Sequence, residues 1–112
     1  MNRDAASIID VERFARRALE FAQRAGTFEA FEQDDVIQSA VLHQLMVLGE
    51  ATKRLSPSFR DKHSDIPWSL MARTRDRLIH KYDDVNLWTV WDTVTKNIPE
   101  VLPQLRALLP DE

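Results

Sequence analysis

The chain has 112 residues, of which 44% are hydrophobic and none is cysteine, and its net charge is −3. This length predicts one domain, residues 1–112, whose small core would gain from association into oligomers. The lack of cysteine excludes a disulfide framework. No apolar run approaches the roughly 18 residues that a membrane span needs, and the N-terminal residues lack the apolar core of a secretion signal. We therefore expect a soluble cytoplasmic protein.

Charge is distributed unevenly along the chain. Residues 53–82 hold eight basic side chains against three acidic ones, a local charge of +5 that leaves −8 for the rest. Non-specific nucleic-acid binding depends on phosphate neutralisation by lysine and arginine, so the acidic total argues against a protein that coats nucleic acid. A basic strip on an acidic body indicates a localised anion site; a plain solvated helix face is the alternative.

The first predicted helix spans about residues 7–25. Its apolar side chains recur at helical spacing, and Gly26 is a typical residue for ending a helix. Residues 27–31 are predicted to form a connector. The apolar stripe of this helix consists of Ile8, Val11, Ala15, Ala18, Ala22 and Ala25.

A second helix is predicted after the connector, with Asp34 or Asp35 as its cap and its end near Leu55. His43 lies within it and is predicted to be a packed or surface histidine, because no second metal ligand occurs at a matching spacing. The stripe that would face the core consists of Val41, Leu45, Leu48 and Leu55.

Residues 56–65 are polar and lack an apolar period, so they are predicted to form a loop. A third helix should follow, with Ser64 or Asp65 as cap and Pro67 in its first turn, where the missing N–H has no effect on helical hydrogen bonding. The apolar and basic residues that follow predict that this helix runs to about Lys81.

Residues 83–86 are predicted to form a turn, with Asn86 capping a fourth helix. Residues 97–99 are predicted to break that helix, because proline is tolerated in the first turn of a helix and not inside one. A short helix over residues 99–109 should follow, with a kink near Pro103. No strand periodicity occurs, so the sequence predicts an all-α, up-and-down bundle of four long helices plus a short C-terminal helix.

The third predicted helix carries the residues richest in chemical function: Arg73, Thr74, Arg75, Asp76, Arg77, Leu78, Ile79, His80, Lys81 and Tyr82. An ordinary helix end would also attract these cations. His80 is the first candidate for proton transfer, since imidazole titrates near pH ~6.5. Arg75 stays protonated and can bind a phosphate bidentately.

Helix geometry constrains how Arg75 and His80 could act together. Five residues of regular helix turn the backbone by about 500°, which leaves the two positions about 140° apart around the axis. Either the helix loosens before His80, or a complete site combines two copies of the motif across a two-fold axis. The second alternative predicts a homodimer.

The spacing of Arg75, His80 and Tyr82 resembles the RxxxxHxY signature of the HepT-like ribonuclease toxins, which belong to the HEPN superfamily. Further segments resemble that family's landmarks in its order: Leu48-Gly49-Glu50-Ala51, Ile66-Pro67-Trp68 and Leu87-Trp88-Thr89-Val90-Trp91. The resemblance implies a HEPN-like homodimer with the motif in the cleft between protomers. It also implies a metal-independent endoribonuclease that cleaves single-stranded RNA without a cofactor, as the toxin of a toxin–antitoxin system.

The resemblance, together with charge and helical spacing, predicts roles for individual residues. Arg75 and His80 would be catalytic; Asp76, Glu50 and Tyr82 would support them; and Arg73, Arg77 and Lys81 would bind RNA. Asp76 could orient the imidazole of His80, although a surface i,i+4 pair explains it equally well, and Glu50 is either in the cleft or exposed. The residue after the motif arginine is often asparagine in this family and is Asp76 here, so a negative charge beside the phosphate could slow cleavage.

The family's partner is an antitoxin, a nucleotidyltransferase of the MNT type that transfers AMP to the motif tyrosine, here Tyr82. A non-catalytic HEPN module that binds RNA or nucleotide beside such a partner is the alternative function. A helical adaptor with no nucleic-acid role is a third possibility.

Overall fold

The computed structural model describes the backbone of residues 2–80 and 86–111, and the side chains of residues 2–74 and 86–111. The predicted all-α fold is confirmed, since the described segments form helices and no strand. The elements are α1 (Arg3–Ala25), α2 (Phe28–Glu32), α3 (Asp35–Lys53), α4 (Pro57–Lys62), α5 (Trp68–His80), α6 (Leu87–Asp92), the π-helical segment η2 (Thr93–Asn97) and α7 (Ile98–Ala107).

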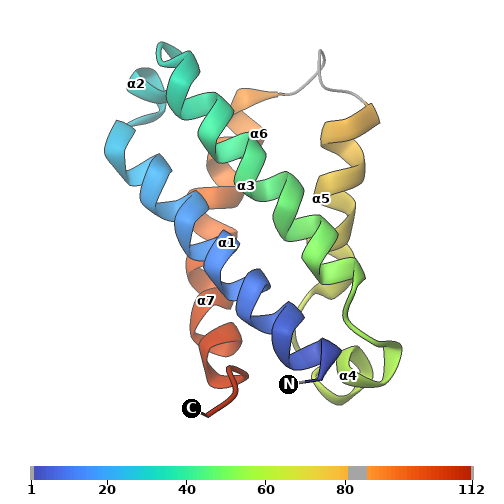
Figure 1. The fold of residues 1–112 in the computed structure, drawn as a ribbon. Coiled ribbons are helices and arrows are strands. Elements are labelled where there is room, and N and C mark those ends of the chain that lie inside the picture. Colours follow the sequence, from blue (N-terminus) through green and yellow to red (C-terminus); the bar gives the residue numbers. More distant parts are fainter. Residues whose placement is uncertain (1, 81–85, 112) are drawn as a thin grey trace.

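The long helices form a bundle in which α3 is central. α3 packs against α1 on one side and α5 on the other, while α1 also packs against α7. Figure 1 shows α6 and α7 forming one column behind α1 and α3. The C-terminal end of α5 and the start of α6 lie at the same end of the bundle, and α4 lies at the opposite end (Figure 1).

The core lies between α1, α3 and the column of α6, η2 and α7, and it extends to the first turns of α5. Phe31, the largest fully buried side chain among the described residues, comes from the short helix α2. The stripes predicted for the first two helices are buried almost throughout: Ile8, Val11, Ala15, Ala18 and Ala22 on α1, and Val41, Leu45 and Leu48 on α3, with Leu55 just beyond it.

Three predicted helix boundaries are confirmed by hydrogen bonds or backbone angles. The Asp34 side chain accepts from the backbone N–H of Ile37 at 3.1 Å, which selects Asp34 over Asp35 as the cap of α3. Asn86 accepts from the N–H of Thr89 at 3.2 Å and caps α6. Gly26 ends α1 with φ +82°, a conformation that side chains with a Cβ disfavour.

Helix α1 begins a full turn earlier than predicted. The Asn2 side chain accepts from the N–H of Ala5 at 2.7 Å, so the helix starts at Arg3 and not near Ser7. The prediction was wrong because it followed the apolar stripe, whereas an amide cap satisfies a free N–H without any apolar residue.

Two segments predicted to be irregular contain helices. α2 lies in the connector after Gly26, and α4 lies in the predicted loop over residues 56–65. Each begins at a hydroxyl cap: Thr27 accepts from the N–H of Ala30 at 3.1 Å, and Ser56 accepts from the N–H of Phe59 at 3.2 Å. Helices of five or six residues are too short to show an apolar period, so only their caps could have indicated them.

Helix α5 begins at Trp68, three to four residues later than the predicted caps Ser64 and Asp65. Those two residues lie in a turn after α4 and do not cap the helix. Instead, the carbonyl of Pro67 accepts from the N–H of Met71 at 3.2 Å. The indole N–H of Trp68 donates to the carbonyl of His63 at 3.0 Å, and this bond fixes the start of α5 against the turn.

The predicted break at residues 97–99 is wrong, because the backbone stays helical from α6 through η2 into α7. The N–H of Ile98 donates to the carbonyl of Thr93, five residues earlier, which gives a wider π turn. Pro99 lacks an N–H, and its ring would crowd the preceding turn of a regular helix. A π turn just before Pro99 relieves that conflict without ending the helix.

No helix within residues 2–80 and 86–111 is long and apolar enough to cross a membrane.

Candidate functional site

The backbone of the motif is α-helical as far as His80. Residues 75–80 form the last turns of α5, so the alternative in which the helix loosens before His80 is wrong. The side chains of Arg75, Asp76, Arg77 and His80 lie outside the described residues, as do Lys81 and Tyr82 entirely. Their predicted roles, including the pairing of Asp76 with His80, stay predictions.

The helix register assigns the two central motif positions to different sides of α5. Trp68 and Met71 are buried, whereas Arg73 is exposed. Position 75 follows Met71 by four residues and therefore lies within about 40° of it around the axis. Position 80 follows Arg73 by seven residues and lies within about 20° of it. The backbone thus places position 75 on the same side of the α5 axis as Met71 and position 80 on the same side as Arg73.

Arg73 is the one predicted RNA-binding residue whose side chain is described. It is exposed and forms no ion pair with any other side chain that the structure describes. Its neighbour Thr74 donates a hydrogen bond to the carbonyl of Leu70 at 3.0 Å, one turn back, so that hydroxyl is occupied within the helix. A free guanidinium on the same side of α5 as position 80 can bind a phosphate.

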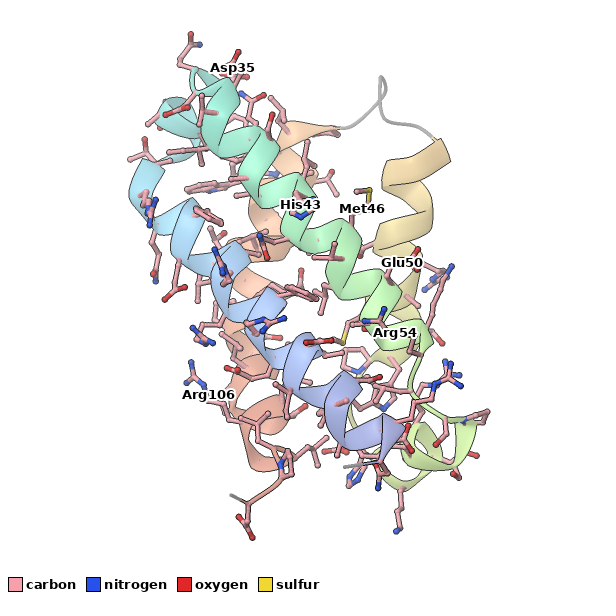
Figure 2. All side chains as sticks on the ribbon, viewed as in Figure 1. Asp35, His43, Met46, Glu50, Arg54 and Arg106 are labelled. Carbon is pink, nitrogen blue, oxygen red and sulfur yellow. The ribbon has the colours of Figure 1, made fainter. Side chains whose placement is uncertain are left out.

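Glu50 lies on the edge of α3 that faces α5. Figure 2 shows Glu50 and Met46, one turn apart, on this edge, and the Glu50 side chain is half-buried. The alternative of a fully exposed Glu50 is therefore wrong. Since α3 packs along α5, the carboxylate lies beside the helix that carries the motif.

The basic strip predicted over residues 53–82 is not one continuous surface. Its described members lie on three helices or, for Arg54, directly after α3, and Arg54 forms an ion pair with Asp10 of α1 at 3.5 Å. Arg60 and Lys62 lie on α4, at the end of the bundle opposite His80 (Figure 1). Of the described cations in this strip, Arg73 alone lies on the motif helix.

Aromatic side chains gather at the same end of the bundle as His80. This aromatic cluster consists of Phe28, Phe31, Trp88 and Trp91, contributed by α2 and α6. The rings of Phe28 and Trp88 meet edge to face with centroids 4.9 Å apart, and Phe31 and Trp91 have centroids 5.2 Å apart. Trp88 nevertheless keeps 53% of its surface exposed. In the sequence, Trp88 is recognisable only as part of a family landmark, and no pattern there predicts its exposure.

Other candidate sites are few in the part of the chain that the structure describes. No three His, Cys, Asp or Glu side chains there lie close enough together to hold a metal ion. His43 is exposed on α3, as predicted for a surface histidine (Figure 2). A cavity of about 360 Å³ lies at the opposite end of the bundle from His80, between the start of α1, α4 and the residues after α7.

Comparison with known proteins shows which family this chain belongs to. Residues 11–108 match the model of the family described as "Ribonuclease HepT-like". "Putative RNase TTE0752" of Caldanaerobacter subterraneus subsp. tengcongensis is 43% identical over 77% of this chain and 77% of its own length. "Probable ribonuclease HepT" of Thermococcus cleftensis is 43% identical over 72% of this chain and 74% of its own.

A more distant relative covers more of the chain. "Putative RNase MJ1380" of Methanocaldococcus jannaschii is 29% identical over 92% of this chain and 94% of its own length. No solved structure matches the chain. With a family model that spans most of α1 and all of α2 to α7, and with positions 75 and 80 on one helix of the expected bundle, the chain belongs to the HepT-like ribonuclease family.

Proposed function

We propose that this ribonuclease is the toxin of a toxin–antitoxin pair and that it cleaves single-stranded RNA without a metal, at a site shared by two protomers. The observation that carries the proposal is the regular helix through His80. In such a helix, positions 75 and 80 are about 140° apart around the axis. Within one protomer, positions 75 and 80 therefore lie on different sides of α5 and do not face one phosphate.

A two-fold homodimer resolves this divergence. If the C-terminal end of α5 packs beside its partner copy, a two-fold axis brings the two copies of the motif into one cleft, where position 80 of one protomer can approach position 75 of the other in two equivalent sites. The same contact would cover Leu70, which keeps 59% of its surface exposed on α5. Static light scattering across a dilution series tests the dimer: a folded, active monomer would contradict it.

The chemistry follows from the residue types. Cleavage needs a base for the ribose 2′-OH proton, a cation for the charge on the phosphorane and an acid for the leaving 5′-oxygen. His80 exchanges the protons, and Arg75 holds the phosphate. Arg73, Arg77 and Lys81 bind the flanking phosphates. Glu50 and Asp76 act as positioning residues for the two catalytic side chains.

The test of catalysis is cleavage of a single-stranded oligoribonucleotide in EDTA by the wild type and by His80→Ala. The wild type should cleave, and His80→Ala should lose activity by at least about 100-fold, the usual contribution of acid–base catalysis. His43→Ala is the matched control, because it removes an exposed imidazole from α3. Equal activity of wild type and His80→Ala would contradict the assignment, and activity that requires a metal would contradict metal independence.

Regulation is proposed to act through Tyr82, two residues after His80 in the sequence. A nucleotidyltransferase antitoxin of the MNT type would transfer AMP from ATP to the Tyr82 hydroxyl, with release of pyrophosphate. The phosphodiester formed would bring a negative charge and a nucleotide to the cations that must receive RNA.

Intact-mass spectrometry after incubation with the partner, ATP and magnesium should show an AMP adduct on the wild type and none on Tyr82→Phe. Tyr82→Phe should also remain toxic when the partner is present. An adduct of the same mass on Tyr82→Phe would place the modification elsewhere.

A further inference from the structure

Trp88 differs from the other two tryptophans in how its indole is used. Trp68 is 5% exposed and donates its N–H to the carbonyl of His63. Trp91 is half-buried and packs on Phe31 with ring centroids 5.2 Å apart. Trp88 is 53% exposed, although it lies on the same short helix as Trp91. The indole of Trp88 therefore extends from the core instead of completing it.

The contact between Phe28 and Trp88 leaves a face of the indole uncovered. The two ring planes meet at 84° with centroids 4.9 Å apart, so one ring presents its edge to the other. Whichever ring supplies the edge, Phe28 covers at most one face of the indole. The same contact holds Trp88 in place, because Phe28 also meets Trp91 edge to face, with centroids 6.5 Å apart.

Trp88 lies within reach of RNA bound at the motif. Five residues lie between His80 and Asn86 in the sequence, and the six Cα–Cα steps of an extended chain limit the distance between their Cα atoms to about 20 Å. Trp88 follows Asn86 by two residues, in the first turn of α6. Figure 1 shows the end of α5 and the start of α6 at one end of the bundle. At about 3.4 Å per stacked nucleotide, about six nucleotides would cover this span.

We infer that Trp88 is a stacking platform for a base of the RNA substrate, a few nucleotides from the phosphate held at the motif. Every base has a π-face, so stacking on an indole strengthens binding of single strands without reading a particular sequence. The rigid support from Phe28 lowers the entropy lost when the base docks. This inference rests on the proposed function, because it takes the RNA path to begin at the motif.

The experiment measures binding of a 2′-O-methyl oligoadenylate, which lacks the 2′-OH nucleophile and is not cleaved. Trp88→Ala should raise the Kd by about fivefold to 150-fold, the range for loss of one stacked base. Trp88→Phe should restore most of the affinity, because a phenyl ring still stacks. Val36→Ala, which removes another exposed apolar side chain, in the first turn of α3, should have a much smaller effect.

Fluorescence and kinetics distinguish stacking from a structural role. Oligoadenylate should quench the tryptophan emission of the wild type, and Trp88→Phe should lose most of that quenching, since Trp68 is buried and Trp91 half-buried. With a cleavable oligoribonucleotide, Trp88→Ala should raise KM and leave kcat nearly unchanged.

Two outcomes would overturn the inference: an unchanged Kd in Trp88→Ala, or a lower molar mass of that variant in solution, which would assign Trp88 to the protomer interface. Failure of the proposed function looks different. In that case the wild type does not cleave RNA, or His80→Ala cleaves it normally, whatever residue 88 is.

Discussion

The shared site predicts a crossed pattern of activity in mixed dimers. In regular helix, the Cα atoms of residues 75 and 80 are separated by about 7.5 Å along the axis and about 140° around it, or roughly 9 Å in all. The backbone is regular through His80, so no local distortion shortens this separation. Each site should therefore take Arg75 from one protomer and His80 from the other.

Mixed dimers carrying two affinity tags can be purified and assayed with a single-stranded oligoribonucleotide. A dimer of Arg75→Ala with His80→Ala has one site with both residues intact and one site with neither, so it should show about half of the wild-type kcat. A dimer of the wild type with the double variant has one defective residue in each site, and it should be nearly inactive.

Sites contained within single protomers predict the reverse pattern. The first mixed dimer would then be inactive, and the second would keep about half of the activity. Homodimers of Arg75→Ala and of His80→Ala, each of which should be inactive, serve as controls. Finding the reverse pattern would refute the shared site while leaving both residues catalytic.

Three further predictions concern stability. Gly26→Ala should destabilise the fold by about 1–2 kcal/mol in urea unfolding, because no atom lies near the new Cβ and the strain at φ +82° acts alone; an unchanged midpoint would contradict the backbone assignment. Phe31→Ala should cost about 3–5 kcal/mol by the same assay, and a loss below 1 kcal/mol would contradict its full burial. Two hydrogen bonds from Ser56, with the larger effect from its hydroxyl and the smaller from its backbone N–H, lower the pKa of Asp4 below its ordinary value of 3.8. The charged form of Asp4 therefore stabilises the fold above that value, and the melting-temperature difference between the wild type and Asp4→Asn should be present at pH 7 and shrink as the pH falls below 3.8; a constant difference would refute the linkage.

The long helices could be predicted from sequence because each buries a stripe that repeats at helical spacing. The two short helices could not, since five or six residues show no period, and their signals were the hydroxyls of Thr27 and Ser56. Pro99 misled the prediction for a different reason. The rule that proline ends a helix assumes α-helical hydrogen bonding, and the bond from Ile98 to Thr93 shows a π turn there instead.

The candidate site was predictable in its residues and only partly in its geometry. Residue types and spacing identified Arg75 and His80 without any knowledge of the fold. Sequence alone left open whether the helix loosens before His80, because that depends on backbone hydrogen bonds. It also left open whether Glu50 is exposed, because α3 and α5 are far apart along the chain and meet only through tertiary packing. The exposure of Trp88 depends in the same way on where Phe28 lies.

The hydrogen bond from the indole of Trp68 to the carbonyl of His63 holds the start of α5 in place, so the direction of the helix axis depends on this contact. From Trp68 to His80 the helix axis rises by about 18 Å. A tilt of only about 5° at the base would therefore move the backbone of His80 sideways by about 1.6 Å. Displacing a catalytic group by about 1 Å can slow an enzyme about 100-fold. The rate of RNA cleavage should therefore depend on the indole of Trp68, which lies at the opposite end of α5 from His80.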